Sequence, residues 1–219
     1  NAKTSLRRIA AGSLDTQELR EVLQDVAHDG KRASDVIQQI RGFVKKGSIQ
    51  TEPLKLNAII QEVIALVLGE LMRQHVSLRT ELADDLPQVL GDRVQLQQVV
   101  LNLIMNSIEA MRDVDDRSRE LIIQSGRDGA ASVVVAVRDS GPGLGLGDPD
   151  LIFNAFYTTK PGGMGMGLSV SRSIVEAHGG RLWTTPHESR GATFQFSLPT
   201  TSSPPGRPGS RCPAPPPAG

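Results

Sequence analysis

Two asparagines, Asn102 and Asn106, interrupt an otherwise apolar helical pattern in residues 98–111. A spacing of four residues places both carboxamides on one face of a helix, one turn apart. Carboxamide oxygens can bind Mg²⁺, which usually completes its octahedron with waters and substrate phosphates. On this segment alone, an amphipathic helix with two hydrogen-bonded amides explains the pattern equally well. The two asparagines are therefore a candidate ligand site that needs support from elsewhere in the chain.

A carboxylate followed by glycines forms the second candidate. Asp139 ends a β-rich run, and Gly141 and Gly143 lie in the turn after it. A carboxylate at the end of a strand can accept a hydrogen bond from an exocyclic amine, which favours adenine over guanine. Glycines at such a turn let the backbone approach a ring closely. The alternative interpretation is a simple turn capped by Asp139.

A glycine cluster forms the third candidate. Gly163, Gly165 and Gly167 alternate with methionines and are followed by Leu168, at the start of a predicted helix. Backbone amides at a helix N-terminus, together with the helix dipole, suit phosphate oxygens. The spacing does not fit a dinucleotide-binding fingerprint, and no Gly-Lys-Ser or Gly-Lys-Thr of a P-loop occurs.

Four stretches in this order resemble the catalytic ATP-binding domain of two-component sensor histidine kinases. Residues 98–111, 139–143, 153–160 and 163–168 look like the N, G1, F and G2 boxes of that family. The resemblance covers residues 53–199 well and residues 1–47 more loosely. It implies ATP and Mg²⁺ as ligands and the two-layer α/β sandwich of the GHKL (Bergerat) ATPases as the fold.

The resemblance also implies a role for each motif residue. Asn106 would bind Mg²⁺, and Asn102 would assist with the metal or a phosphate. Asp139 would read adenine. Gly141 and Gly143 would shape the base pocket. Gly163, Gly165 and Gly167, with Leu168, would hold the phosphates.

Residues 153–160 resemble the F box and a very short lid over the nucleotide. We expect Phe156 and Tyr157 to anchor this lid by burying their rings. Lys160 would then place a point charge on the triphosphate and act in catalysis with Asn102. An exposed lysine in a loop is the alternative for Lys160.

The sequence departs from related patterns at two positions. Many kinases have a lysine where this chain has Glu109, although the short-lid subgroup often has an acidic residue there. The related gyrase and chaperone ATPases have a glutamate, which activates water, where this chain has Asn102. An amide cannot act as that general base, so rapid hydrolysis is disfavoured and the γ-phosphoryl group is left for another nucleophile.

Residues 1–47 read as a partial helical hairpin. Apolar residues at alternating spacings of three and four predict a seam that would pack in a four-helix bundle with a second copy. A hairpin packed on its own domain is the alternative. The resemblance identifies it as the dimerisation and phosphotransfer hairpin, but His28, His75, His178 and His187 all lack the expected flanking residues. We therefore expect the acceptor histidine to precede Asn1.

Hydrophobic periodicity predicts an α+β fold with helices on one face of a mixed sheet. The expected strands are 54–57, 76–82, 86–91, 121–125, 132–137, 181–185 and 192–198, and helices are expected at 58–72, after an N-cap at Asp92, and at 167–177. Gly179 and Gly180 should end the last helix. The expected regions are the hairpin at 1–47, the catalytic ATP-binding domain at 48–199 and a disordered Pro-rich tail at 200–219.

Composition excludes several classes of protein. The formal net charge is +0, which argues against a nucleic-acid binder acting through a basic field. The single Cys212 permits neither a disulfide framework nor a thiolate metal site. No apolar run reaches the length of a spanning helix. We expect a cytoplasmic location, with any membrane attachment in segments before Asn1, since the chain begins without methionine and reads as an excerpt.

The pattern as a whole predicts the ATP-binding catalytic region of a bacterial sensor histidine kinase. It would transfer the γ-phosphoryl group of ATP to a histidine for relay to an aspartate of a response-regulator receiver domain. It would act as a homodimer through the hairpin. A GHKL ATPase driven by nucleotide-gated dimerisation and an acceptor-less, non-enzymatic dimeric adaptor that docks a response regulator are the alternatives.

Overall fold

The computed structural model describes residues 51–112, 114, 118–129, 131–144, 150–158, 165–186 and 190–201. All of them belong to one unit of the chain, Ile49–Gly219. The predicted hairpin at 1–47 and the tail after Thr201 lie outside the described residues. Within the described part, no helix is long and apolar enough to cross a membrane.

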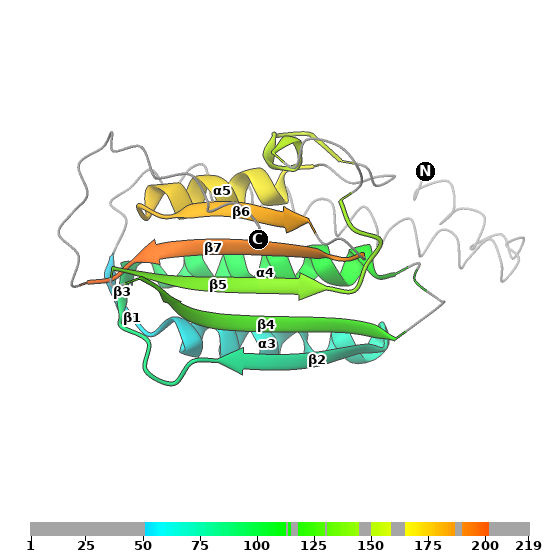
Figure 1. The fold of residues 1–219 in the computed structure, drawn as a ribbon, viewed down its shortest axis with the longest axis horizontal. Coiled ribbons are helices and arrows are strands. Elements are labelled where there is room, and N and C mark those ends of the chain that lie inside the picture. Colours follow the sequence, from blue (N-terminus) through cyan, green and yellow to red (C-terminus); the bar gives the residue numbers. More distant parts are fainter. Residues whose placement is uncertain are drawn as a thin grey trace, which may run out of the picture. The chain divides into compact units, whose positions relative to one another are not determined.

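A five-stranded mixed sheet forms one layer of the domain, in the order β2-β4-β5-β7-β6 (Figure 1). Its strands are β2 (Val76–Leu82), β4 (Arg119–Asp128), β5 (Ser132–Asp139), β6 (Arg181–Pro186) and β7 (Ala192–Pro199). β2 pairs with β4 in parallel, and the other pairs are antiparallel. A separate two-stranded sheet pairs β1 (Glu52–Leu54) with β3 (Val89–Gly91). The predicted mixed sheet is therefore confirmed.

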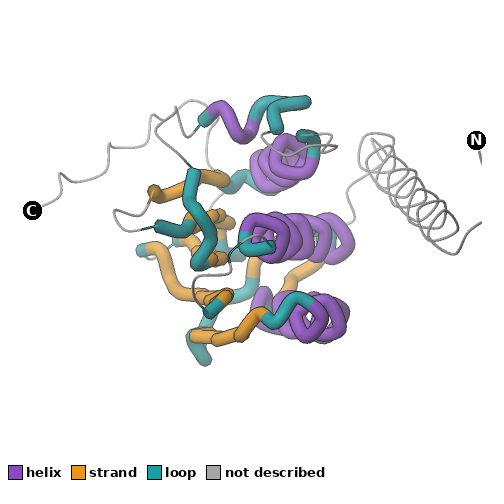
Figure 2. The backbone as a smooth tube through the Cα atoms, turned by 90° about the vertical axis from the view of Figure 1, so that its right-hand side faces the viewer, coloured by secondary structure: helices purple, strands orange, loops and turns teal. Residues whose placement is uncertain are grey.

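Three helices form the second layer: α3 (Leu56–Arg73), α4 (Arg93–Ala110) and α5 (Gly167–Ala177). They lie side by side on one face of the sheet (Figures 1 and 2). A short 3₁₀ turn, η1 (Leu151–Phe153), precedes α5 in sequence. This arrangement is the predicted two-layer α/β sandwich.

Alternation in the strands and helical periodicity in α4 build the core between the layers. Every second side chain of β5 points inward, and the three that do so are fully buried: Val133, Val135 and Val137. α4 buries a stripe at helical spacing: Leu96, Val99, Val100, Leu103, Ile104 and Ile108. Asn102 and Asn106 lie beside this stripe and are half-buried, so α4 carries its amides at the border of the core.

The helix ends are fixed by specific contacts. The side chain of Asp92, the predicted N-cap of α4, accepts hydrogen bonds from the backbone N–H groups of Val94 (3.0 Å) and Gln95 (3.1 Å). At the end of α5, Gly179 N–H donates to Glu176 O and Gly180 N–H to Val175 O, both at 2.9 Å. With Gly179 at φ +74°, these bonds form a Schellman motif, as the two glycines predicted.

His178 joins the two helices that carry the predicted site. Its ring is buried, and Nε2 accepts a hydrogen bond from the backbone N–H of Asp92 at 3.0 Å. Nδ1 lies 2.7 Å from Ile174 O, so Nδ1 carries the proton and donates to this carbonyl. The C-terminal end of α5 is therefore tied to the N-terminal end of α4.

Some strand boundaries differ from the prediction; β4, for example, extends beyond the expected 121–125 at both ends. β1 ends at Leu54 and α3 begins at Leu56, so the strand expected at 54–57 is wrong over its last residues. The strand expected from residue 86 begins only at Val89. Beyond Pro199, Thr200 N–H donates to Ala131 O and Thr201 N–H to Gln88 O, both at 2.9 Å. Such bonds join main-chain groups, so the pattern of side chains in the sequence does not predict them.

We expect Gly180→Ala to destabilise the domain by about 2–3 kcal/mol, because overpacking a tight site costs this much. A Cβ at residue 180 would lie 1.9 Å from the Ser197 carbonyl oxygen of β7. Gly126→Ala in β4 is the matched control, since a Cβ there would meet nothing within 4 Å. Urea unfolding measures both, and equal stability of the two variants would contradict the packing described here.

Candidate functional site

The two asparagines of α4 face the start of α5. A Cβ placed on Gly167 would lie 4.0 Å from Cγ of Asn102 and 4.0 Å from Nδ2 of Asn106. A larger residue at 167 would fill the space between the amides and the helix start. The structure therefore brings the first and the last of the predicted motifs together.

Asn102 is held by the first turns of α5. Its Nδ2 group lies 3.3 Å from Gly167 O and 3.3 Å from Ser171 Oγ, and donates to both. Ser171 Oγ in turn donates to Gly167 O at 3.0 Å. Asn102 therefore has a structural role in joining α4 to α5, in addition to its predicted role toward a ligand.

Asp139 lies at the end of β5, as predicted, with only 3% of its surface exposed. Its Oδ1 atom accepts hydrogen bonds from the backbone N–H groups of Gly141 (2.8 Å) and Ala192 (3.3 Å). A carboxylate that accepts bonds from backbone amides is fixed in orientation. The orientation of the carboxylate is therefore set by backbone N–H groups just after β5 and at the start of β7.

The turn after Asp139 packs against α4. A Cβ at Gly141 would lie 2.8 Å from Asp139 Oδ1 and 3.3 Å from Ala110 O, the last residue of α4. Ala110 follows Asn102 and Asn106 at the same spacing of four, so the three lie on one helix face. Eight residues of helix span about 12 Å. One face of α4 thus connects the start of α5 with the turn after Asp139.

Sequence reasoning missed Gly191 and Ala192. Gly191 has φ +86°, and a Cβ there would lie 2.2 Å from the carbonyl oxygen of Asp139. Gly143, with φ +91°, packs against Gly191 in turn, because its Cβ would lie 3.3 Å from Gly191 O. A glycine just before a strand was the only signal, and it does not reveal which residue it approaches.

The segment before the glycine cluster is attached to it through the backbone. Phe156 N–H donates to Gly165 O at 3.0 Å. Gly165 has φ +63°, and a Cβ there would lie 2.4 Å from Tyr157 O, so no side chain fits. The F-box segment and the glycine motif are therefore packed together at this point. Lys160 and Gly163 lie outside the described residues.

The expectation that Phe156 and Tyr157 bury their rings is wrong. Phe156 is 75% exposed and Tyr157 40% exposed, whereas Phe153 is only 4% exposed. Phe156 has φ +68°, a left-handed conformation that turns its side chain out of the register of its neighbours. Phe153 is therefore the anchor of this segment.

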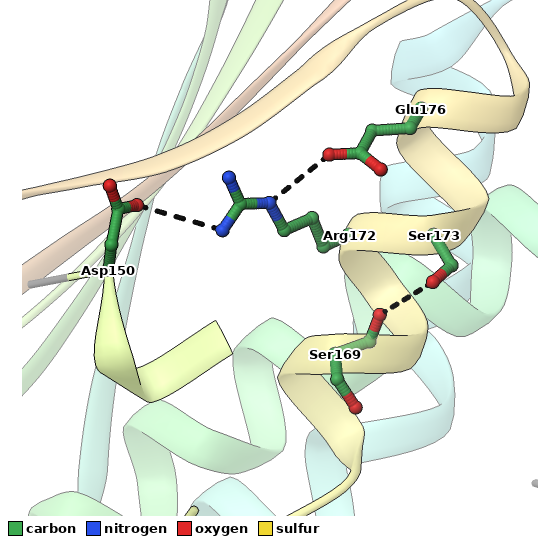
Figure 3. A network of polar contacts seen from close by, with 5 residues as sticks. All are labelled: Asp150, Ser169, Arg172, Ser173 and Glu176. Carbon is green, nitrogen blue, oxygen red and sulfur yellow. Dashed lines mark hydrogen bonds and ion pairs between the residues drawn. The ribbon is translucent and has the colours of Figure 1, made fainter. Parts of the chain in front are cut away.

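A polar network on α5 covers Phe153. The Arg172 guanidinium lies 5.3 Å from the centroid of the Phe153 ring. As Figure 3 shows, Arg172 also pairs with Asp150 (Nη1 to Oδ1, 3.6 Å) and Glu176 (Nε to Oε1, 3.1 Å). These ion pairs are exposed and contribute at most about 1 kcal/mol each. Burial of Phe153 therefore contributes most of the anchoring.

The donor set at the asparagines suits a metal that is shared with a ligand. The described residues contain no group of three or more His, Cys, Asp or Glu that could hold a metal ion. One or two carboxamide oxygens, completed by phosphates and water, fit Mg²⁺.

The comparisons with known proteins agree on one family. Residues 91–202 match the family described as "Histidine kinase-, DNA gyrase B-, and HSP90-like ATPase". The chain is 36% identical to the sensor histidine kinase TmoS of Ectopseudomonas mendocina over 202 residues, 92% of this chain and 21% of TmoS. It is 41% identical to the sensor protein FixL of Bradyrhizobium diazoefficiens over 195 residues, 88% of this chain and 38% of FixL.

Solved structures agree with these sequence matches. The catalytic domain of histidine kinase ThkA is 32% identical, with a TM-score of 0.62 over 69% of this chain and 99% of that domain. ThkA in complex with the response regulator protein TrrA is 28% identical, with a TM-score of 0.72 over 91% of this chain and 56% of that chain. The chain spans less than half the length of the two curated relatives named above.

We expect Phe153→Ala to lower the free energy of unfolding by about 3–5 kcal/mol, the usual cost of removing a buried ring. Phe156→Ala is the matched control and should change it by less than about 0.5 kcal/mol, as for other exposed positions. Urea unfolding of the two variants measures the difference. A large loss from Phe156→Ala, with little from Phe153→Ala, would restore the original expectation.

Proposed function

We infer the function from the family to which the chain belongs, the histidine kinase-, DNA gyrase B- and HSP90-like ATPases. The chain carries the catalytic ATPase region of a bacterial sensor histidine kinase. We propose that it binds Mg²⁺-ATP along α4 and presents the γ-phosphoryl group to a histidine. The domain of this family binds ATP. One observation carries the proposed placement: Asn102, Asn106 and Ala110 lie on one face of α4, which runs from the start of α5 to the turn after Asp139.

Each end of this face has its own chemistry. At the Asp139 end, a buried carboxylate with a fixed orientation accepts a hydrogen bond from the exocyclic amine of adenine. Gly141 and Gly143 shape the base pocket, because without side chains they pack closely against Ala110 and Gly191. At the α5 end, backbone N–H groups near Gly165, Gly167 and Leu168 hold phosphate oxygens. Gly163 would extend this set of donors.

Asn106 and Asn102 are the residues that would hold Mg²⁺, with Asn106 as the direct ligand. The bound cation supplies charge neutralisation at the phosphates. Lys160 adds a second positive charge on the triphosphate. The contribution of the chain to phosphoryl transfer is then mostly positioning and charge stabilisation.

The residue at position 102 favours transfer to a histidine over hydrolysis. Its amide nitrogen is committed to Gly167 O and Ser171 Oγ, and an amide has no proton-accepting nitrogen with which to activate water. The γ-phosphoryl group is therefore retained for a nucleophile from another part of the protein. A hydrolysing, nucleotide-gated dimer is the less favoured alternative for the same reason.

The acceptor and the partners belong to the wider proposal. Of the histidines in the described residues, His178 is buried in a helix junction and His75 lies on the loop after α3. We place the acceptor outside this chain, with residues 1–47 as part of a dimerisation hairpin and 48–199 as the catalytic domain. The complex of ThkA with the response regulator TrrA supports a receiver domain as the partner.

Asp139→Asn tests the adenine assignment. The asparagine can still accept the two backbone bonds, but it presents an NH₂ group to the amine of the base. Loss of a charged hydrogen bond should weaken binding of a non-hydrolysable ATP analogue by about 10–100-fold. Isothermal titration measures the affinity, with thermal unfolding to confirm the fold. Asp128→Asn on the exposed end of β4 is the control, and unchanged affinity at Asp139 would refute the assignment.

Asn106→Ala tests the metal assignment. Wild-type chain should bind the ATP analogue more tightly in Mg²⁺ than in EDTA, and the variant should lose most of this difference because the direct oxygen ligand is gone. Gln61→Ala, which removes an exposed carboxamide from α3, should behave like wild type. A normal response of Asn106→Ala to Mg²⁺ would exclude this residue as the ligand.

A further inference from the structure

Ser171 is a buried hydroxyl at the contact between α4 and α5. It has no exposed surface, and it lies one turn after Gly167 on the face of α5 that meets Asn102. Its Oγ atom accepts from Asn102 Nδ2 at 3.3 Å and donates to Gly167 O at 3.0 Å. Neither the predicted motifs nor the function proposed above assigns a role to this residue.

The three groups define which way the Asn102 amide must face. Gly167 O is a carbonyl oxygen and can only accept a hydrogen bond. The Asn102 nitrogen, at 3.3 Å, can donate to it, whereas the amide oxygen in the same place would oppose acceptor to acceptor. Ser171 directs its proton to the same carbonyl, so its lone pairs are turned to Asn102. Both contacts are therefore satisfied only when Nδ2 of Asn102, and not Oδ1, faces α5.

The consequence concerns the other atom of the amide. With Nδ2 committed to α5, Oδ1 of Asn102 is the atom that remains for a ligand. Within the described part of the chain, this oxygen accepts no hydrogen bond from another residue. A cation or a hydrogen-bond donor on a nucleotide is the kind of group that an amide oxygen can bind.

We propose that Ser171 is a positioning residue, which holds the Asn102 amide with its oxygen presented to the magnesium-bound phosphates. The inference rests on the function proposed above and adds a residue outside all four motifs. Without the Ser171 hydroxyl, the Asn102 amide keeps only one hydrogen-bond acceptor on α5, Gly167 O, and can rotate about its terminal bond. Part of the population then presents the wrong atom.

Helix α5 contains a natural control for this effect. Ser173 Oγ donates to Ser169 O at 3.1 Å, which is the same bond to the carbonyl four residues earlier that Ser171 makes (Figure 3). Ser173 is exposed and lies about 200° around the helix from Ser171. Substitution of either serine by alanine removes one such intrahelical bond, but only Ser171→Ala removes the contact with Asn102.

The experiment measures affinity for a non-hydrolysable ATP analogue in Mg²⁺ and in EDTA, using the whole chain. Ser171→Ala should weaken binding in Mg²⁺ by about fivefold, the effect of one lost hydrogen bond, with little change in EDTA. Ser173→Ala should leave both values unchanged. Ser171→Cys is close in size to serine but accepts hydrogen bonds poorly, so it should show the same loss. It replaces the alanine variant in the test if Ser171→Ala does not fold.

A double-mutant cycle with Asn102→Ala distinguishes positioning from a general effect on the fold. If Ser171 acts through Asn102, Ser171→Ala should have no further effect on Mg²⁺-dependent affinity once Asn102 is alanine. Equal losses from Ser171→Ala in both backgrounds, or an equal loss from Ser173→Ala, would overturn the inference. If wild-type chain shows no Mg²⁺-dependent binding at all, the proposed function fails first, which is a separate result.

Discussion

The contact between α4 and α5 is the constraint on which the site depends. α4 must bury Leu96, Val99 and Leu103 against the sheet and still keep two amides at the edge of the core. Burial of an amide is tolerated only if its hydrogen-bonding groups are satisfied. The start of α5 supplies the acceptors for Asn102, so the same glycine-led helix both completes the core and borders the phosphate end of the site.

The adenine end depends on a different device, which is the close approach of backbone segments. Gly191 lies against the carbonyl of Asp139, and Gly143 lies against Gly191. Side chains are excluded from these contacts, so the floor of the proposed base pocket is built from main chain. Its shape is consequently less sensitive to side-chain rotamers than a pocket built of long residues would be.

The sequence allowed prediction of what depends on local pattern. The span of α5, the Asp92 cap and the strand of Val76–Leu82 follow from periodicity, capping and alternation, and all three are confirmed. Features that depend on contacts distant in sequence could not be predicted this way. The burial of Phe153 in place of Phe156 reflects a left-handed backbone, and the roles of Gly191 and Ser171 depend on partners 52 and 69 residues away.

The buried ring of His178 fixes one end of α5. Its C-terminal end is tied to the first turn of α4 and closed by the Schellman bonds, whereas its other end is held by amide contacts of 3.3 Å. An 11-residue helix is about 16 Å long, so a tilt of about 5° around the histidine moves its glycine end by about 1.4 Å. A rotation of α5 about this histidine would therefore displace the end that contacts Asn102 most and the histidine end least.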